Sequence, residues 1–355
     1  MPATQPDSTQ AHSTPAALGY RMPAEWEPHA ATWLAWPHER SDWPGKFAPV
    51  PWVYGEVVRY LSQVETVSIL IPDAGTEKSA RTVLTKSGSN LQRVEFVHCP
   101  TNRSWTRDSC PIFVRDGAGR VAMTHWRFNG WAKYANHEHD AAIPLLLRKR
   151  LRVPYFKPKH GKWHVVLEGG SIDVNGAGVL MTTEECLLSP IQARNPGLSR
   201  RDVEQYLKDY LGVSEVLWLR NGIAGDDTHG HVDDLARFAN PSTILIASES
   251  DRTEANYTAL AENVRLLRAQ KRWNVVTLPM PKPVCFDGQR LPASYANFYI
   301  ANQLVLVPVF NDPNDRAALN AIARAFPDRE TVPIYCGDLV LGLGTLHCMT
   351  QQQPT

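Results

Sequence analysis

Helical segments recur along this chain at a nearly constant spacing, and this regularity constrains the fold more than any other feature. Apolar residues at helical spacing predict five helices, over residues 76–87, 140–151, 200–211, 254–271 and 315–326. The centres of the last four lie about 60 residues apart, and a unit repeated at a fixed spacing is typical of an array or a closed ring.

Short β-rich runs lie between the predicted helices. They cover residues 67–71, 94–97, 165–167, 172–174, 216–219, 243–246, 275–278 and 304–307. Strand pairs alternating with single helices predict an α/β fold of about five ββαβ units around an axis, with helices outside and loops meeting at the centre. A further helix over residues 53–64 precedes the first unit and is placed to close the ring. The alternative, a doubly wound sheet, would show strict strand–helix alternation and a phosphate-binding glycine loop, and neither is visible.

Composition narrows the class of partner. The net charge is +1, and no basic run or aromatic–basic interleaving marks a nucleic-acid groove. No apolar run is long enough to span a bilayer. We therefore expect a small molecule or a peptide as the partner, with neither nucleic acid nor membrane involved.

The cysteines and the first residues indicate where the protein works and where its domain begins. Six cysteines are scattered without CxxC pairing, which predicts reduced thiols in a cytoplasmic protein. Residues 1–19 are rich in Pro, Ser, Thr, Gln and Ala and predict a disordered tail. No low-complexity linker follows, so residues 20–355 are expected to form one domain.

One cysteine, Cys348, lies seven residues before Thr355. The apolar, glycine-punctuated run over residues 339–344 precedes it and predicts a buried strand that bends at its glycines. This would carry the thiol into the interior. A lone cysteine is more commonly inert core, so a catalytic reading requires a base and charged partners elsewhere.

Such partners occur in three polar clusters at or beside strand ends, at residues 105–108, 167–173 and 225–234. Each alone has a structural explanation: Asp108 could cap a turn, and Glu168 could be a turn carboxylate. His229, His231 and Asp233 could bind a metal from one strand face, but no further ligand cluster completes the coordination. His229 is also explained as a turn histidine.

Together the clusters indicate one kind of chemistry. Carboxylates near a thiol raise its pKa, which would hinder ordinary acyl transfer. The arrangement is useful if the substrate brings a permanent positive charge. A guanidinium group is such a cation, and its forked donors match carboxylates bidentately.

Seven motifs in the same order make the chain resemble the agmatine deiminase and bacterial peptidyl-arginine deiminase family, within the guanidino-modifying (pentein) superfamily. The motifs lie at residues 22–29, 33–37, 105–108, 168–170, 225–238, 295–298 and 347–354. The resemblance implies a five-fold pseudo-symmetric α/β propeller without metal or organic cofactor. It also implies hydrolysis of a guanidinium to a ureido group with release of ammonia.

Matching the motifs residue by residue assigns roles to the candidates. Cys348 resembles the nucleophile, His231 the general acid/base, Asp108 and Asp233 the guanidinium clamp, and Glu168 the group that orients His231 and fixes the guanidinium. Trp105, Asp227 and Asn297 are expected to contact the substrate. His347, adjacent to Cys348, is not the expected base, because neighbouring side chains of an extended segment point to opposite faces. Of the tryptophans, we expect no more than one or two at the pocket.

The substrate's identity stays open at this point. Family members carry paired glycines after the tryptophan of a loop that here runs Phe-Asn-Gly-Trp-Ala-Lys-Tyr, residues 128–134. Agmatine is the first expectation, with Asp226 or Asp227 to receive its amine; free or peptidyl arginine is the alternative, with Lys133 solvated or paired to a carboxylate. An amidinotransferase and a non-catalytic guanidine-binding protein are further alternatives, and a homodimer is compatible with all of them.

Overall fold

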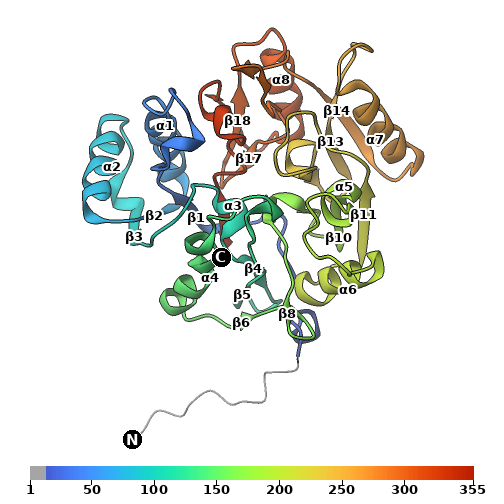
Figure 1. The fold of residues 1–355 in the computed structure, drawn as a ribbon, viewed down its shortest axis with the longest axis horizontal. Helices are drawn as coiled ribbons and strands as arrows, with labels where there is room; N and C mark the ends of the chain where they lie inside the picture. Colours follow the sequence, from blue (N-terminus) through green and yellow to red (C-terminus); the bar gives the residue numbers. More distant parts are fainter. Residues whose placement is uncertain (1–12) are drawn as a thin grey trace, which may run out of the picture.

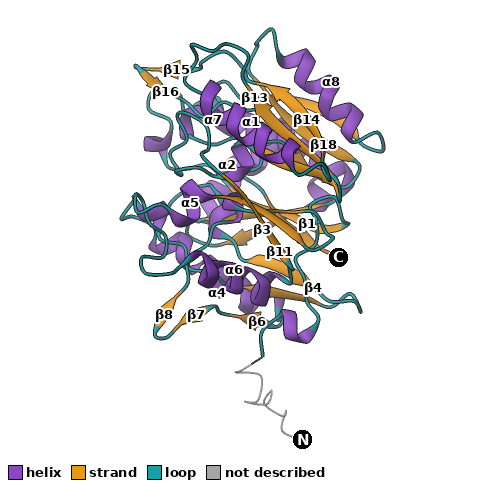
Figure 2. Cartoon of the chain, turned by 90° about the vertical axis from the view of Figure 1, so that its right-hand side faces the viewer, coloured by secondary structure: helices purple, strands orange, loops and turns teal. Residues whose placement is uncertain are grey.

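A computed structural model describes residues 13–355 of the chain. All six predicted helices are present, with ends that match the predicted ones or differ from them by a few residues. They are α1 Val50–Val64, α2 Ala74–Lys86, α4 Glu138–Leu151, α6 Arg200–Leu211, α7 Tyr257–Ala269 and α8 Asp315–Ala325, with short helices α3 Thr106–Ser109 and α5 Glu184–Leu188 between them. Figures 1 and 2 show the long helices toward the outside of the molecule, covering the strands.

The three-stranded sheets of the described chain share one pattern, an antiparallel pair followed by a helix and a parallel strand. Four sheets follow this order along the chain: β4–β5–β6 (Ile112–Arg115, Val121–Thr124, Tyr155–Phe156), β9–β10–β11 (Asp173–Val174, Val179–Thr183, Glu215–Leu219), β12–β13–β14 (Ala236–Asn240, Thr243–Ser248, Asn274–Pro279) and β17–β18–β19 (Tyr299–Ile300, Leu304–Val309, Glu330–Tyr335). This is the predicted ββαβ unit.

The remaining large sheet joins the two ends of the described chain. Its order is β20–β1–β2–β3, with bounds Gln351–Pro354, His29–Ala35, Thr66–Ile71 and Val94–His98. β1 pairs in parallel with β2, whereas β20 supplies the antiparallel neighbour, with Trp33 opposite Gln351. The segment after Cys348 is therefore held in a sheet, and it does not fray.

Two predicted strands are wrong. Residues 165–167 form no strand, and Val166 makes only an isolated bridge with Arg127. Residues 339–344 begin with a 3-10 turn, η8 Leu339–Gly342. The Trp43 indole packs against this turn and donates to the Leu339 carbonyl at 2.9 Å, and a Cβ on Gly342 would lie 2.6 Å from the ring. The glycine thus serves close packing against Trp43.

The predicted disordered tail extends too far. Residues 1–12 lie outside the described residues, but residues 13–19 include a 3-10 turn, η2 Ala16–Leu18. Gly19 ends it with φ 82°, and Met22 donates its backbone N–H to Leu211 at the end of α6. These backbone bonds order the segment that composition alone marks as a tail.

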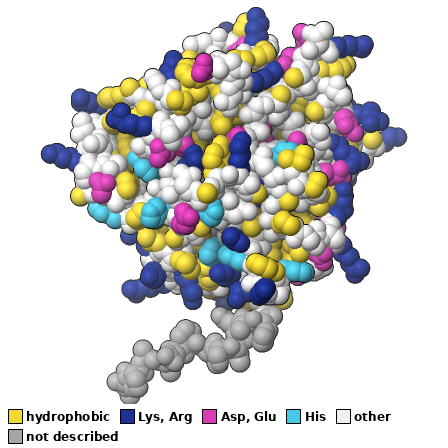
Figure 3. Space-filling model, viewed as in Figure 1, with side chains coloured by type: hydrophobic (Ala, Val, Ile, Leu, Met, Phe, Trp, Pro, Cys, Tyr) yellow, Lys and Arg dark blue, Asp and Glu magenta, His cyan; other side chains and the backbone are white. Residues whose placement is uncertain are grey.

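Within residues 13–355, no helix is long and apolar enough to cross a membrane. On the face shown in Figure 3, basic and acidic side chains are interspersed, so that no single-sign stripe covers it.

Candidate active site

A cavity of about 410 Å³ opens beside the Cys348 thiol. Its wall includes two of the predicted catalytic residues, Asp108 and Cys348, and two tryptophans, Trp105 and Trp131. Asp227 also lies in the wall. The prediction that one or two tryptophans reach the pocket is confirmed.

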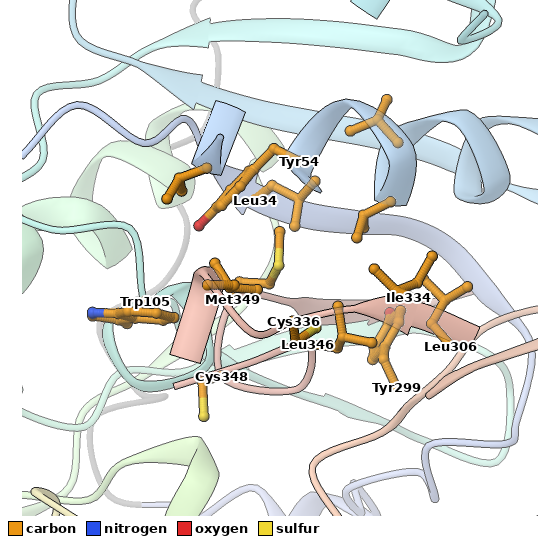
Figure 4. Packing of buried hydrophobic residues seen from close by; sticks show 14 of the residues in the cluster. Leu34, Tyr54, Trp105, Tyr299, Leu306, Ile334, Cys336, Leu346, Cys348 and Met349 are labelled. Carbon is orange, nitrogen blue, oxygen red and sulfur yellow. The ribbon is translucent and has the colours of Figure 1, made fainter. Parts of the chain in front are cut away.

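Cys348 lies in a turn that follows η8, so the chain here is not extended. In Figure 4 its sulfur points away from the other labelled side chains of the cluster, with Trp105 to one side. The side-chain amide of Asn297 lies 3.1 Å from the sulfur, and Asp233 Oδ2 lies 3.7 Å from it. The Arg107 backbone N–H donates to the Cys348 carbonyl at 3.2 Å. The turn is thus tied to the helix α3 that carries Asp108.

The electrostatic surroundings keep this thiol neutral. Burial raises the pKa of Cys348 well above its usual value, and the carboxylates of Asp233, Asp234 and Asp108 raise it further. The free thiol therefore resists ionisation, as the sequence analysis predicts.

Asp108 is held in place by two donors. The Gly170 backbone N–H donates to Oδ1 at 2.9 Å, and the Trp131 indole N–H donates to Oδ2 at 2.8 Å. Burial raises the pKa of Asp108 above its usual value. Its carboxylate is thus oriented by fixed groups before any ligand binds.

The glycine pair after Glu168 makes room for this arrangement. A Cβ on Gly170 would lie 2.6 Å from His231 Nδ1, and 3.0 Å from both Asp108 Oδ1 and Asp233 Oδ2. A Cβ on Gly169 would lie 2.3 Å from the Arg107 carbonyl oxygen. Neither glycine has a positive φ, so the requirement is for space.

His231 lies among three carboxylates. Its Nε2 is 3.7 Å from Glu168 Oε2, and its Nδ1 is 3.9 Å from Asp108 Oδ2 and 4.0 Å from Asp233 Oδ1. Burial opposes a charge on the ring, yet Asp108 and Glu168 outweigh it and raise the pKa of His231 well above its usual value. The ring thus holds a proton beside the cavity, although it does not line the wall.

Glu168 is paired on its other side with Arg194, which the sequence analysis does not identify. Arg194 Nε lies 3.0 Å from Glu168 Oε1, and both side chains are fully buried. Burial raises the pKa of Glu168, but Arg194 and His231 together lower it below the usual range. Glu168 is therefore an ionised partner for His231.

His347 occupies an unexpected place. Because the chain turns here, its ring reaches Asp233 Oδ2 at 2.7 Å and Glu25 Oε2 at 2.8 Å. The extended geometry used to exclude it as the base is wrong, but both of its ring nitrogens are already engaged. Sequence inspection could have noticed Glu25, which lies in the motif at residues 22–29.

Asn297, expected to contact substrate, is buried beside the sulfur and is not among the residues that line the cavity. Its Nδ2 donates to Asp234 Oδ1 at 3.0 Å, and its Oδ1 accepts from the Thr345 hydroxyl at 2.7 Å. Burial, then Asp233 and Asp226, raise the pKa of Asp234 well above its usual value. This placement favours a role for Asn297 in holding the turn that carries Cys348.

The other residues considered in the sequence analysis differ in whether they line the cavity. Asp227 is in the wall, ion-paired with Lys133, so Lys133 is not simply solvated. Asp226 accepts backbone N–H groups of Gly230 and His231 at 2.7 and 2.9 Å and does not line the wall. His229 lies in a turn with φ 63° and reaches Ser189.

Among the predicted catalytic residues, three buried polar atoms have no hydrogen-bond partner within residues 13–355: Glu168 Oε2, His231 Nε2 and Asp233 Oδ1. Two sets of side chains each bring three possible ligand atoms within 4.8 Å of one another: Glu168–Cys186–His231 and Asp233–Asp234–Cys348. Both sets suit a cation. The two carboxylate oxygens are acceptors, and buried unsatisfied acceptors are costly, so they favour a ligand rich in donors. A guanidinium group has five N–H donors.

A family model and curated relatives both match nearly the whole chain. A family model described as Porphyromonas-type peptidyl-arginine deiminase matches residues 21–354. The agmatine deiminase of Pseudomonas aeruginosa is 36% identical over 371 residues, covering 96% of this chain and 97% of the relative.

Two solved structures have the same fold. The agmatine deiminase of Enterococcus faecalis has a TM-score of 0.88 at 31% identity, covering 97% of this chain and 98% of that one. The agmatine deiminase of C. jejuni has a TM-score of 0.84 at 30% identity, covering 95% and 96%.

Proposed function

The chain belongs to the Porphyromonas-type peptidyl-arginine deiminase family and is a hydrolase of amidine C–N bonds, and we propose that its substrate is agmatine, converted to N-carbamoylputrescine and ammonia. One observation carries the proposal. A neutral thiol and the clamp carboxylate Asp108 line one cavity, with Asp233 3.7 Å from the sulfur. That arrangement suits an electrophile that is itself a cation.

In this mechanism Asp108 and Asp233 bind the guanidinium group and place its carbon against the Cys348 sulfur. The cation reverses the local field, so the thiol can ionise. A C–S bond forms and a C–N bond breaks. The thiol proton passes to solvent, and His231 gives its own proton to the nitrogen that departs as ammonia.

A thiouronium intermediate then remains on Cys348 and is hydrolysed. His231 takes a proton from water, whose oxygen bonds to the carbon as the C–S bond breaks. The Cys348 thiol is regenerated and the ureido product is released. The remaining proton converts ammonia to ammonium. Glu168 orients His231 through both steps, and Arg194 keeps Glu168 in place.

Agmatine is preferred over arginine because of two residues in the cavity wall. Asp227 offers a carboxylate to the agmatine amine, and Trp105 offers an apolar face to its carbon chain. Phe286 and Gln289, from the hairpin β15–β16 (Cys285–Phe286, Gln289–Arg290), also line the cavity. A peptidyl arginine would need a cleft without such a cover.

We also propose that residues 20–355 act as one catalytic domain with a five-fold propeller arrangement. The support is that the site draws on residues from Glu25 to Cys348, and that the ββαβ unit recurs. A cytoplasmic location and a homodimer stay predictions from the sequence.

The test is to measure the ureido product from agmatine, free arginine and a blocked arginine peptide side by side. We expect agmatine to be converted most efficiently. Cys348→Ala should abolish turnover while leaving thermal unfolding unchanged. A clear preference for the peptide would overturn the choice of agmatine, and an amidinated amine product in place of ammonia would indicate an amidinotransferase.

A further inference from the structure

The carboxylate of Asp227 lies between the cavity and a lysine of a neighbouring loop. Lys133 forms an ion pair with Oδ1, and the Tyr134 hydroxyl donates to Oδ2 at 2.7 Å. Asp227 and Tyr134 line the cavity beside Cys348, whereas Lys133 approaches from outside the wall. The Lys133 ammonium group and the cavity therefore share one carboxylate, that of Asp227.

The neighbouring Asp226 shows why this pairing can exchange. Its carboxylate is fixed by backbone N–H groups of Thr228, Gly230 and His231, which cannot rotate away. Within residues 13–355, the hydrogen-bonding partners of the Asp227 carboxylate are side chains only. A ligand can replace one of them without moving the main chain.

The loop that carries Lys133 is itself fixed. Trp131 donates to Asp108, and the Gln192 amide donates at 3.2 Å to the carbonyl oxygens of both Trp131 and Asp227. Gly130, Trp131 and Ala132 have φ of 63°, 57° and 55°. Non-glycine residues adopt this left-handed region only when their surroundings impose it. Movement is thus confined to the Lys133 side chain, which is 43% exposed.

We propose that Lys133 is a built-in competitor for the ammonium end of the substrate. The inference rests on the proposed function, in which a guanidinium substrate with a second cationic end enters this cavity. In the free protein Lys133 neutralises Asp227. When substrate binds, its ammonium replaces Lys133 on Oδ1, while Tyr134 keeps its bond to Oδ2. Lys133 then extends into solvent beside the Tyr134 ring, whose centre is already 5.5 Å from Nζ.

This competition lowers affinity for every guanidine with a cationic tail, and leaves affinity for neutral-tailed guanidines unchanged. Since the pair is partly exposed, releasing it should correspond to about a five-fold change in affinity. Lys133 therefore sets how strongly the site discriminates in favour of a diamine-type substrate.

The test uses calorimetric binding of agmatine and of n-butylguanidine, which lacks the amine, to Cys348→Ala protein. Adding K133M should tighten agmatine about five-fold and leave butylguanidine within two-fold. In a D227N background, K133M should change neither affinity, because the shared carboxylate charge is gone. K46M is the matched control: it removes a Lys46–Asp338 pair of similar exposure, and neither residue lines the cavity.

Three results would overturn the inference: K133M weakens agmatine binding, K133M tightens both ligands equally, or its effect persists beside D227N. Absence of agmatine binding in all variants would overturn it too, since Asp227 would then receive no amine. Failure of the proposed function is seen separately, when the protein with its Cys348 intact binds agmatine as expected but forms no ureido product.

Discussion

His347 Nδ1 lies 2.7 Å from Asp233 Oδ2, whereas Asp233 Oδ1 has no hydrogen-bond partner within residues 13–355. Burial would raise the pKa of Asp233, but the hydrogen bond from His347 and the nearby charges lower it below its usual value. In the proposed clamp, one oxygen of Asp233 is therefore fixed by His347, and the proposal assigns the other to the substrate. The second ring nitrogen of His347 binds Glu25, so the ring cannot turn away.

We expect His347→Phe to lower kcat/KM for agmatine about 10- to 100-fold, because an unpaired buried carboxylate corresponds to about 1–3 kcal/mol. Steady-state kinetics, together with thermal unfolding, measure this change. His98→Phe is a suitable control, since it removes a 2.7 Å His–Glu contact at an exposed site. Normal kinetics in a folded His347→Phe protein would mean that Asp233 needs no such support.

Asp108→Asn and Asp233→Asn should each reduce substrate binding and the chemical step. Each change removes one partner of a desolvated ion pair, which corresponds to a loss of about 3–5 kcal/mol. Dissociation constants for agmatine and single-turnover rates separate the two effects. A variant with unchanged affinity would place that aspartate outside the clamp.

The reactivity of Cys348 toward iodoacetamide should depend on a bound cation. Burial and three aspartates favour the neutral thiol, so its pKa is raised and alkylation of the free protein should begin only in strongly alkaline solution. A guanidinium ligand that cannot be deiminated favours the thiolate and should shift this profile to lower pH. The measurement is the alkylation rate against pH, followed by mass spectrometry. Rapid alkylation of free Cys348 at neutral pH would show that substrate is not needed for ionisation.

Gly170→Ala should abolish most activity by steric displacement of the site. The new Cβ would meet His231 at 2.6 Å, closer than such contacts are tolerated, while Gly117→Ala meets nothing within 4 Å. Turnover and melting temperature of both variants are the readouts. We expect the Gly170 variant to lose at least 100-fold in kcat/KM, a barrier change of about 3 kcal/mol, and the Gly117 variant to match the parent. Equal activities would show that His231 can shift without consequence.

Much of this architecture could be predicted from local patterns. The helix Arg200–Leu211 has the predicted bounds because its signals are local: Ser199 caps its first turn and Gly212 ends it at φ 66°. The run at residues 165–167 is equally apolar but forms only one bridge, because strand formation depends on a partner that the sequence does not reveal.

The site also has a part that could be predicted from the sequence and a part that could not. Asp108, Glu168, His231, Asp233 and Cys348 could be selected from motifs, and the structure brings them together. Arg194, 26 positions from Glu168, could not be selected in this way. Asn297 could be selected from a motif, but its contact with Cys348, 51 positions away, could not be predicted. Only packing of the whole chain makes these pairs neighbours.

The contact between His347 and Glu25 closes a loop of 322 residues. Contacts of such sequence separation form late, since the entropy of closing the loop opposes them until most other structure is in place. During refolding, helical signal should therefore return before enzyme activity. A partly folded molecule would have helices and a thiol but no clamp, so recovered turnover would report the last stage of folding.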